Sequence, residues 1–215
     1  MTRVVALIDY GSGNLRSAEN ALRRASARLD PSPEIVTTND HDVIARSDAV
    51  VLPGVGAFSA CMRALESTNG ALAGIEAAVR VRGVPFLGIC VGMQLLATRG
   101  LEFGETPGLG WIAGDVERLR PDGPRAKVPH VGWNAVDFTP DAALFRRLPM
   151  GADMYFTHSF ALAAREASDV AAWTDHGGRF VAAVTRGNLA GVQFHPEKSQ
   201  AAGLALLANF LEWRP

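Results

Sequence analysis

Cysteine is scarce in this sequence: Cys61 and Cys90 are the only two among 215 residues. A fold that depends on disulfides needs more cysteines than this, so the sequence predicts a protein of a reducing compartment. A chain of this length buries enough surface to fold without cross-links. The two thiols are left to be explained by packing or by reactivity.

A surplus of positive charge is also missing. Lys and Arg number 21 and Asp and Glu number 22, which gives a net charge of −1. With no basic surplus, we expect neither nucleic acid nor an anionic membrane as a partner. The first ten residues, MTRVVALIDY, contain only a short apolar run that ends at Asp9. This run is too short for a secretory signal core or a membrane span, so we expect a cytoplasmic protein.

Linkers, internal repeats and low-complexity tracts are not evident either, and we therefore expect one domain over residues 1–215. In the first half, short apolar runs alternate with segments of helical periodicity. This alternation predicts a parallel sheet built by right-handed crossovers. The expected strands are 4–8, 34–37, 49–52 and 85–89, and the expected helices are 14–27, 57–66, 71–82 and 91–98.

The second half has a different character, with short strand candidates separated by turn residues. These candidates are 114–119, 133–138, 154–161, 170–174, 180–185 and 189–194, followed by an amphipathic helix over 199–213. We expect them to form a mixed or antiparallel extension of the same sheet. The predicted fold class is therefore α/β: a flavodoxin-like, mostly parallel central sheet with helices on both faces, extended in the second half.

The stretch Gly88-Ile89-Cys90-Val91-Gly92 places a cysteine where a predicted strand turns into a predicted helix. It has the form of a nucleophile elbow, in which small flanking residues make room for a sharply turned side chain. The helix N-terminus favours a thiolate, and the Val91 N–H lies where an oxyanion would form. The alternative is a small, unreactive, buried cysteine at a packing point. Cys61 shares a predicted helical face with apolar residues, so core packing is its expected role.

A nucleophilic thiol needs a base, and His195 is the best candidate. It follows a predicted strand, and Glu197 lies two residues further on, so in extended backbone both side chains leave on the same side. Pro196 restricts the backbone on either side of it. A carboxylate beside an imidazole sets its tautomer. Taken alone, a strand-end histidine beside a surface glutamate is the simpler explanation, but together with the elbow a Cys90–His195–Glu197 triad is favoured. Paired metal-ligand spacing is missing, so we expect neither metal nor cofactor.

Several segments together resemble the class I, triad-type glutamine amidotransferases. GICVGMQLL and VQFHPEKS are similar to the motifs of the whole family. DYGSGNLRS, LPGVGAF, PHVGWN and YFTHSF resemble one branch of it, the glutaminase subunits of imidazole glycerol phosphate synthase. These blocks extend from Asp9 to Ser199 and so cover nearly the whole chain.

The resemblance implies that Cys90 attacks the side-chain amide of glutamine, that His195 transfers the thiol proton to the leaving ammonia, and that Glu197 orients His195. It also implies a glutamine pocket. Gln94 and Glu102 would contact the substrate, Glu102 through its ammonium group, and backbone groups of His158, Ser159 and Phe160 would hold its carboxylate. For Gln94 and Glu102 the alternative is polarity near a helix end.

An oxyanion hole usually needs a second donor besides the Val91 N–H. We expect it from the loop Pro53-Gly54-Val55-Gly56. Turning the Val55 N–H toward the nucleophile requires unusual backbone angles, which Gly54 tolerates and β-branched Val55 resists. The hypothesis is that the resting loop leaves the hole incomplete, and that a docked partner with its substrate completes it.

The family's partner is a (β/α)₈-barrel cyclase that receives the ammonia and makes imidazole glycerol phosphate and an aminoimidazole carboxamide ribotide. The resemblance places Asn14, Trp133, Tyr155 and Lys198 at the docking face. For Trp133 and Tyr155 the alternative is ordinary core packing. Three other functions remain open: a glutaminase feeding another synthase, such as pyridoxal phosphate synthase, a non-catalytic binding subunit, and a general cysteine hydrolase.

Overall fold

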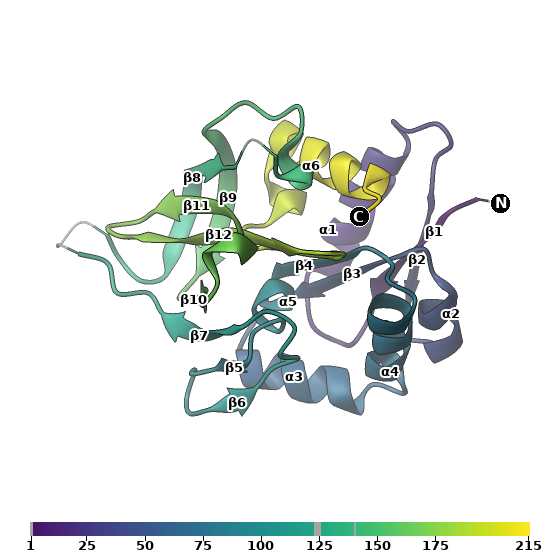
Figure 1. Ribbon diagram of the computed structural model, residues 1–215, viewed down its shortest axis with the longest axis horizontal. Helices are drawn as coiled ribbons and strands as arrows, with labels where there is room; N and C mark the ends of the chain where they lie inside the picture. Colours follow the sequence, from purple (N-terminus) through teal and green to yellow (C-terminus); the bar gives the residue numbers. More distant parts are fainter. Residues whose placement is uncertain (1, 123–125, 140) are drawn as a thin grey trace.

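The computed structural model of the chain describes residues 2–122, 126–139 and 141–215. Within those residues, nine strands form a central sheet in the order β2-β1-β3-β4-β13-β12-β11-β8-β9 (Figure 1). The first five are parallel: β2 (Glu34–Thr38), β1 (Val4–Ile8), β3 (Ala49–Gly54), β4 (Phe86–Cys90) and β13 (Leu189–Val192). The antiparallel part consists of β12 (Arg179–Arg186), β11 (Val170–Asp175), β8 (His130–Phe138) and β9 (Ala152–His158).

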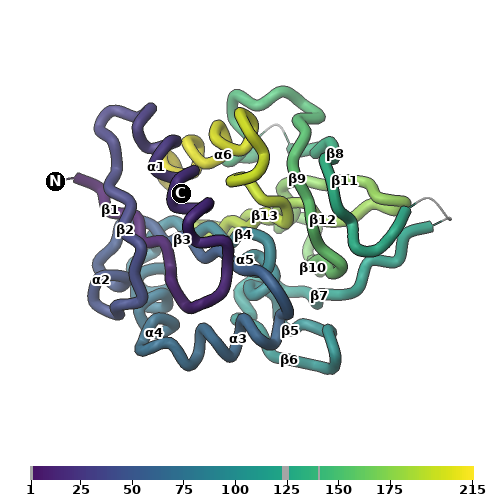
Figure 2. The backbone as a smooth tube through the Cα atoms, turned by 180° about the vertical axis from the view of Figure 1, so that it is seen from behind, coloured from purple at the N-terminus to yellow at the C-terminus, as the bar shows by residue number. Residues whose placement is uncertain are grey.

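Helices cover both faces of the parallel strands, which explains why those strands are apolar along their length. Every residue of β3 and β4 is buried. Helices α1 (Leu15–Ser26) and α6 (Gln200–Glu212) cover one face, and α2 (His41–Arg46), α3 (Phe58–Ser67) and α4 (Ala71–Glu76) cover the other (Figures 1 and 2). The predicted α/β fold, with its parallel core and antiparallel extension, is confirmed.

A second, smaller sheet was not predicted. It has the order β10-β7-β5-β6, with β10 (Phe160–Ala164), β7 (Gly114–Arg118), β5 (Arg99–Gly100) and β6 (Thr106–Pro107). The single strand expected over 154–161 is therefore wrong, because the chain leaves the central sheet at His158 and enters the small sheet at Phe160. The strand expected over 114–119 likewise pairs with β10 and does not extend the central sheet. Alternation along one strand does not show which sheet the strand joins.

The predicted helices over 71–82 and 91–98 also differ from the structure. Helix α4 passes at Ala77 into a π-helical turn, Ala77–Val81. Helix α5 (Val91–Gln94) is short because the carbonyls after it are used elsewhere. The backbone N–H groups of Leu109, Gly110 and Trp111 donate to the carbonyls of residues 95, 97 and 96, respectively. Helix α2 was missed, although the Asp40 side chain caps it by accepting from the N–H groups of Asp42 and Val43.

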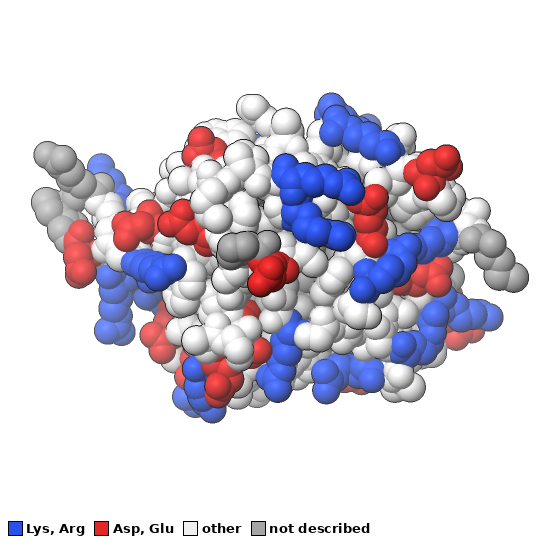
Figure 3. Space-filling view, turned by 45° about the horizontal axis from the view of Figure 1, so that its top comes forward, with Lys and Arg blue, Asp and Glu red and all other residues white. Residues whose placement is uncertain are grey.

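Charged side chains of both signs are interspersed over the face of the molecule seen in Figure 3, in keeping with a net charge of −1. In the described part of the chain, no helix has the length and apolar character that crossing a bilayer requires.

Candidate active site

The elbow predicted around Cys90 is present at the carboxyl end of β4, directly before α5. Cys90 has φ 54° and ψ −112°, a conformation that residues with a side chain rarely adopt. The backbone is so crowded here that a Cβ atom on Gly92 would overlap the carbonyl oxygen of Leu52, and one on Gly88 would overlap the carbonyl of Gly92 itself. The two glycines are therefore required by close backbone approach.

His195 reaches this elbow because β13 pairs with β4 in parallel, which brings the carboxyl ends of both strands to one edge of the sheet. His195 Nδ1 lies 2.8 Å from Glu197 Oε1, and the two side chains are only 2% and 3% exposed. The extended backbone expected between them is wrong: Glu197 lies in a 3₁₀ turn, Pro196–Lys198. Proline is favoured at the first position of such a turn. The turn still brings the Glu197 carboxylate to His195 Nδ1, as expected for the extended backbone.

The electrostatics around His195 favour a charged ring. Burial alone lowers the pKa of His195, but the interactions with Cys90 and Glu197 outweigh it and raise the pKa to about 9. Its Nδ1–H donates to Glu197, which leaves Nε2 directed away from the carboxylate. No hydrogen bond of standard geometry reaches Nε2 from the described residues, although Cys90 and His195 line the same pocket. An imidazolium in this position favours the thiolate form of a neighbouring cysteine.

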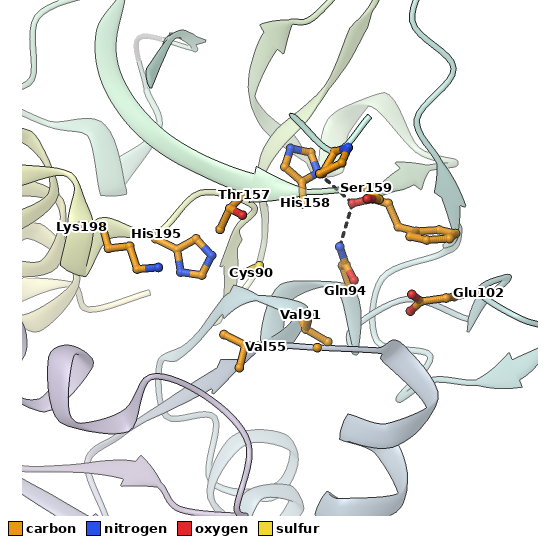
Figure 4. A pocket seen from close by; sticks show the side chains of 13 residues that line it. Val55, Cys90, Val91, Gln94, Glu102, Thr157, His158, Ser159, His195 and Lys198 are labelled. Atoms are coloured by element: carbon orange, nitrogen blue, oxygen red, sulfur yellow. Dashed lines mark hydrogen bonds between the residues drawn. The ribbon is translucent and has the colours of Figure 1, made fainter. Parts of the chain in front are cut away.

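A pocket of about 440 Å³ opens above Cys90. In Figure 4, His195 and Gln94 lie on either side of Cys90, and Glu102 lies beyond Gln94. The lining residues are Val55, Gly56, Cys90, Val91, Gln94, Glu102, Pro129, Thr157, His158, Ser159, Phe160, His195 and Lys198. The structure thus brings together all the residues predicted for the glutamine pocket. Gly54 does not line it but pairs with Cys90 across β3 and β4.

Two polar side chains in the pocket are already hydrogen-bonded. Gln94 Nε2 donates to the carbonyl of Phe160 at 2.9 Å. Glu102 Oε2 accepts from the backbone N–H of Phe58 at 2.8 Å. Each contact fixes the orientation of a group that faces the pocket, so the binding surface is largely formed before a ligand arrives.

Three side chains hold the loop between β3 and α3, which contains Val55, by hydrogen bonds to backbone carbonyls. Tyr10 donates to the carbonyl of Pro53 at 2.8 Å, and Ser12 donates to the carbonyl of Val55 at 2.9 Å. Cys61 also donates to the carbonyl of Val55, at 3.3 Å. Cys61 is buried on the apolar face of α3, as expected. Val55 is not among the non-glycine residues with positive φ, which are Cys90, Phe103, Arg147 and Gln200 in the described part of the chain.

A pair of histidines supports the wall of the pocket, and only one of them was predicted. His158 Nδ1 donates to the carbonyl of Phe160 at 2.9 Å, so its Nε2 accepts from His130 Nδ1 at 3.1 Å. Burial is the main cause that lowers the pKa of His130 to about 4 and that of His158 to about 3. Both rings are therefore neutral near pH 7.

Gln193 was missed as well. Its side chain is 0% exposed, accepts a hydrogen bond from Gln94 and lies 3.7 Å from the Cys90 sulfur. A polar residue between Val192 and Phe194, inside a buried apolar run, was the sequence signal that could have identified it. Among the residues that the structure describes, no group of three His, Cys, Asp or Glu side chains is placed to hold a metal ion.

Three of the four residues predicted at the docking face lie together. Trp133 packs edge-on against Tyr155 with ring centroids 5.9 Å apart, and the Lys198 ammonium lies 5.6 Å from the Tyr155 ring centroid. Trp133 is 48% exposed, which disagrees with ordinary core packing. Asn14 is exposed at the start of α1.

Comparisons with known proteins agree with this geometry. The imidazole glycerol phosphate synthase subunit HisH of Caulobacter vibrioides is 60% identical over 213 residues, covering 99% of this chain and 100% of the relative. The HisH subunit of Rhodospirillum rubrum is 51% identical over 98% of this chain and 99% of its own.

Among solved structures, one glutamine amidotransferase has a TM-score of 0.71 at 18% identity and covers 96% of this chain and 97% of its own. Another, from Thermotoga maritima, has a TM-score of 0.61 at 16% identity, with coverage of 92% and 77%. At these identities the structures support the fold alone. The glutamine amidotransferase class-I family model matches residues 6–213, and with the two relatives aligned from end to end it shows that this chain belongs to that family.

Proposed function

We propose that this chain hydrolyses glutamine to glutamate and ammonia and passes the ammonia to a cyclase, which makes imidazole glycerol phosphate and an aminoimidazole carboxamide ribotide in histidine biosynthesis. The observation that carries the proposal is the meeting of Cys90, His195 and Glu197 at one edge of the sheet, beside a pocket of about 440 Å³. The two HisH relatives, which are named as subunits of imidazole glycerol phosphate synthase, support the product proposed for the cyclase.

In the proposed mechanism, the Cys90 sulfur attacks the side-chain carbonyl carbon of glutamine. The carbonyl oxygen takes up negative charge, and the N–H of Val91 stabilises it. His195 Nε2 carries the proton that came from the thiol and gives it to the amide nitrogen, so ammonia leaves and a glutamyl thioester remains. Water, deprotonated by the same nitrogen, then attacks the thioester and releases glutamate. Glu197 keeps the ring oriented throughout.

The pocket fits the two ends of an amino acid. Glu102 offers a carboxylate for the ammonium group, and its contact with the Phe58 N–H keeps it in place. Backbone groups around His158, Ser159 and Phe160 would hold the carboxylate of glutamine. Gln94 would contact the substrate between these ends and the thiol.

The loop that contains Gly54 and Val55 would supply the second oxyanion donor only after it moves. Two observations support this resting state of the loop. Side chains already hold the carbonyls of Pro53 and Val55, and Val55 does not have a positive φ. Losing one such donor lowers the rate roughly 10²–10³-fold in another hydrolase. A partner that turns the peptide would therefore switch the glutaminase on.

The partner in this proposal is a (β/α)₈-barrel cyclase that forms a heterodimer with this chain in the cytoplasm. The docking face of this chain would include Trp133, Tyr155, Lys198 and Asn14, because a half-exposed tryptophan packed edge-on against a tyrosine is a typical interface anchor. Residues 1–215 would act as one domain, since β13 from the second half pairs with β4 from the first.

The deciding experiment measures glutamine hydrolysis by the chain alone, with the cyclase, and with the cyclase plus its ribotide. We expect little activity from the chain alone and strong activity from the complex with the ribotide.

Equal rates under all three conditions would contradict the loop hypothesis. No glutaminase activity under any of them would contradict the proposed function and favour a non-catalytic binding subunit. Stimulation only by a different synthase, such as that for pyridoxal phosphate, would contradict the proposed partner. Labelling of Cys90 by a glutamine-like diazo-ketone would argue against a general cysteine hydrolase.

A further inference from the structure

Gln193 is a fully buried amide in a place where an apolar side chain would be easier to accommodate. Its neighbours Val192 and Phe194 are 0% exposed, as it is itself. Its backbone N–H donates to the carbonyl of Ala182 at 2.8 Å, so the residue is fixed in the sheet. Burying an amide is unfavourable unless its polar atoms find partners. The hydrogen-bond partners of the Gln193 side chain therefore indicate why an amide is buried here.

Both partners of the Gln193 side chain belong to the proposed active site. The register of β13 and β4 pairs Val192 with Ile89, and the next residue after β13, Gln193, has its side chain beside Cys90. Gln193 Nε2 lies 3.7 Å from the Cys90 sulfur, within hydrogen-bonding distance for sulfur. Its Oε1 accepts from Gln94 Nε2 at 3.0 Å.

These contacts also determine how Gln94 is turned. The amide nitrogen of Gln94 has two N–H groups, and they are directed to the carbonyl of Phe160 and to Gln193 Oε1. With both donors used, the group that Gln94 presents to the pocket is its carbonyl oxygen, an acceptor. An acceptor there suits the N–H groups of glutamine and not the oxygens of glutamate.

We propose that Gln193 is a further catalytic residue: it donates an N–H to the sulfur of Cys90 and, with its other end, fixes Gln94 so that an acceptor faces the substrate. The inference rests on the proposed glutaminase function. A donor aimed at sulfur stabilises the thiolate more than the thiol, because hydrogen bonds to charged groups are the stronger ones.

The test compares Gln193→Met with the unchanged chain, both in complex with the cyclase and its ribotide. Methionine has a similar size and lacks both polar ends. Alkylation of Cys90 by iodoacetamide is followed from pH 5 to pH 10 by mass spectrometry of the peptide that contains it, which separates Cys90 from Cys61. We expect the pH midpoint of alkylation to rise by about one unit and kcat to fall roughly 10- to 100-fold, as for a lost hydrogen bond to a charged group. KM for glutamine should rise as well.

Two matched variants separate the contacts. Gln94→Met should raise KM and leave the alkylation midpoint in place, because the contact between Gln193 and sulfur survives. Asn188→Asp removes an amide at the other end of the same strand, where Asn188 donates to the carbonyls of Val79 and Val84. The Asn188→Asp variant should change stability and leave the alkylation midpoint, kcat and KM unchanged.

A folded Gln193→Met variant with an unchanged midpoint and unchanged kcat overturns the inference. Gln193→Leu, which also lacks both polar ends, repeats the measurement if the methionine variant does not fold. If the unchanged complex fails to hydrolyse glutamine, the proposed function fails first, and the two failures are therefore distinguishable.

Discussion

At the scale of single residues, Cys90 occupies a backbone conformation that an unreactive cysteine would have no reason to adopt. Its φ of 54° is unfavourable for any residue with a Cβ atom, at a cost on the order of 1–3 kcal/mol. The crowding at Gly88 and Gly92 holds it there. The strain places the thiol at the edge of the sheet, facing the pocket, and so favours reactivity over packing.

The two smallest replacements of this cysteine should therefore both lose activity but differ in stability. Cys90→Gly and Cys90→Ala should both abolish glutamine-dependent turnover by the complex and leave ammonia-dependent turnover intact. Glycine relieves the strain, so Cys90→Gly should be at least as stable as Cys90→Ala, although glycine elsewhere loses about 0.5–1 kcal/mol to alanine. Urea unfolding of the two variants measures the difference. A glycine variant clearly less stable than the alanine variant contradicts the argument.

The site residues were predictable to different degrees. Cys90 and His195 stand in short motifs whose spacing carries chemical meaning, and so does Glu197. Gln193 was not predictable in the same way, because its role depends on the register between β13 and β4, which one sequence does not reveal. His130 was missed for a similar reason: its partner His158 lies on the neighbouring strand β9.

At the scale of elements, the joint between β4 and α5 depends on backbone contact with β3. Gly92→Ala would push a Cβ atom into the carbonyl oxygen of Leu52, an atom that cannot move without disturbing β3. We expect a loss of stability of about 2 kcal/mol or more, since overpacking usually costs 1–3 kcal/mol, together with a loss of activity. Gly187→Asn is the control, because open space surrounds Gly187 and asparagine tolerates its φ of 57°. Thermal unfolding of both variants checks this, and equal small losses would contradict it.

The same scale shows where pattern-based prediction fails. Strands β1, β3 and β4 are apolar runs between turn signals and were found nearly to the residue. The transfer at Ser159 from the central to the small sheet leaves no trace in the alternation of side chains. The early end of α5 is caused by residues 109–111, which are remote in sequence from the helix they terminate.

At the scale of the whole molecule, the neutral pair His130 and His158 makes stability depend on pH. In the unfolded chain both titrate near 6.5, whereas burial lowers the pKa to about 4 for His130 and about 3 for His158. Between these values the unfolded chain binds more protons than the folded one. Stability is therefore fully present above pH 6.5 and is lost as the pH falls toward 4 and 3.

Removing one ring should flatten this dependence. His130→Asn should reduce the loss of unfolding free energy between pH 6.5 and pH 4 by roughly 1–3 kcal/mol, given about 1.4 kcal/mol for each pKa unit. Urea unfolding at both pH values measures it. If the unfolding free energy of His130→Asn depends on pH as in the unchanged chain, the acid sensitivity does not come from this pair.

The pairing of β4 with β13 has one more consequence. Cys90 is the last residue of β4, whereas His195 lies beyond Val192, the last residue of β13, and its backbone N–H donates to the carbonyl of Tyr155 on β9. Both residues of the proton-transfer pair are therefore attached to one continuous sheet. Because one sheet carries both residues, we expect their separation to change little when a partner docks. We therefore expect any restraint on glutamine consumption to act through the loop after β3, which begins just beyond Gly54, the residue paired with Cys90.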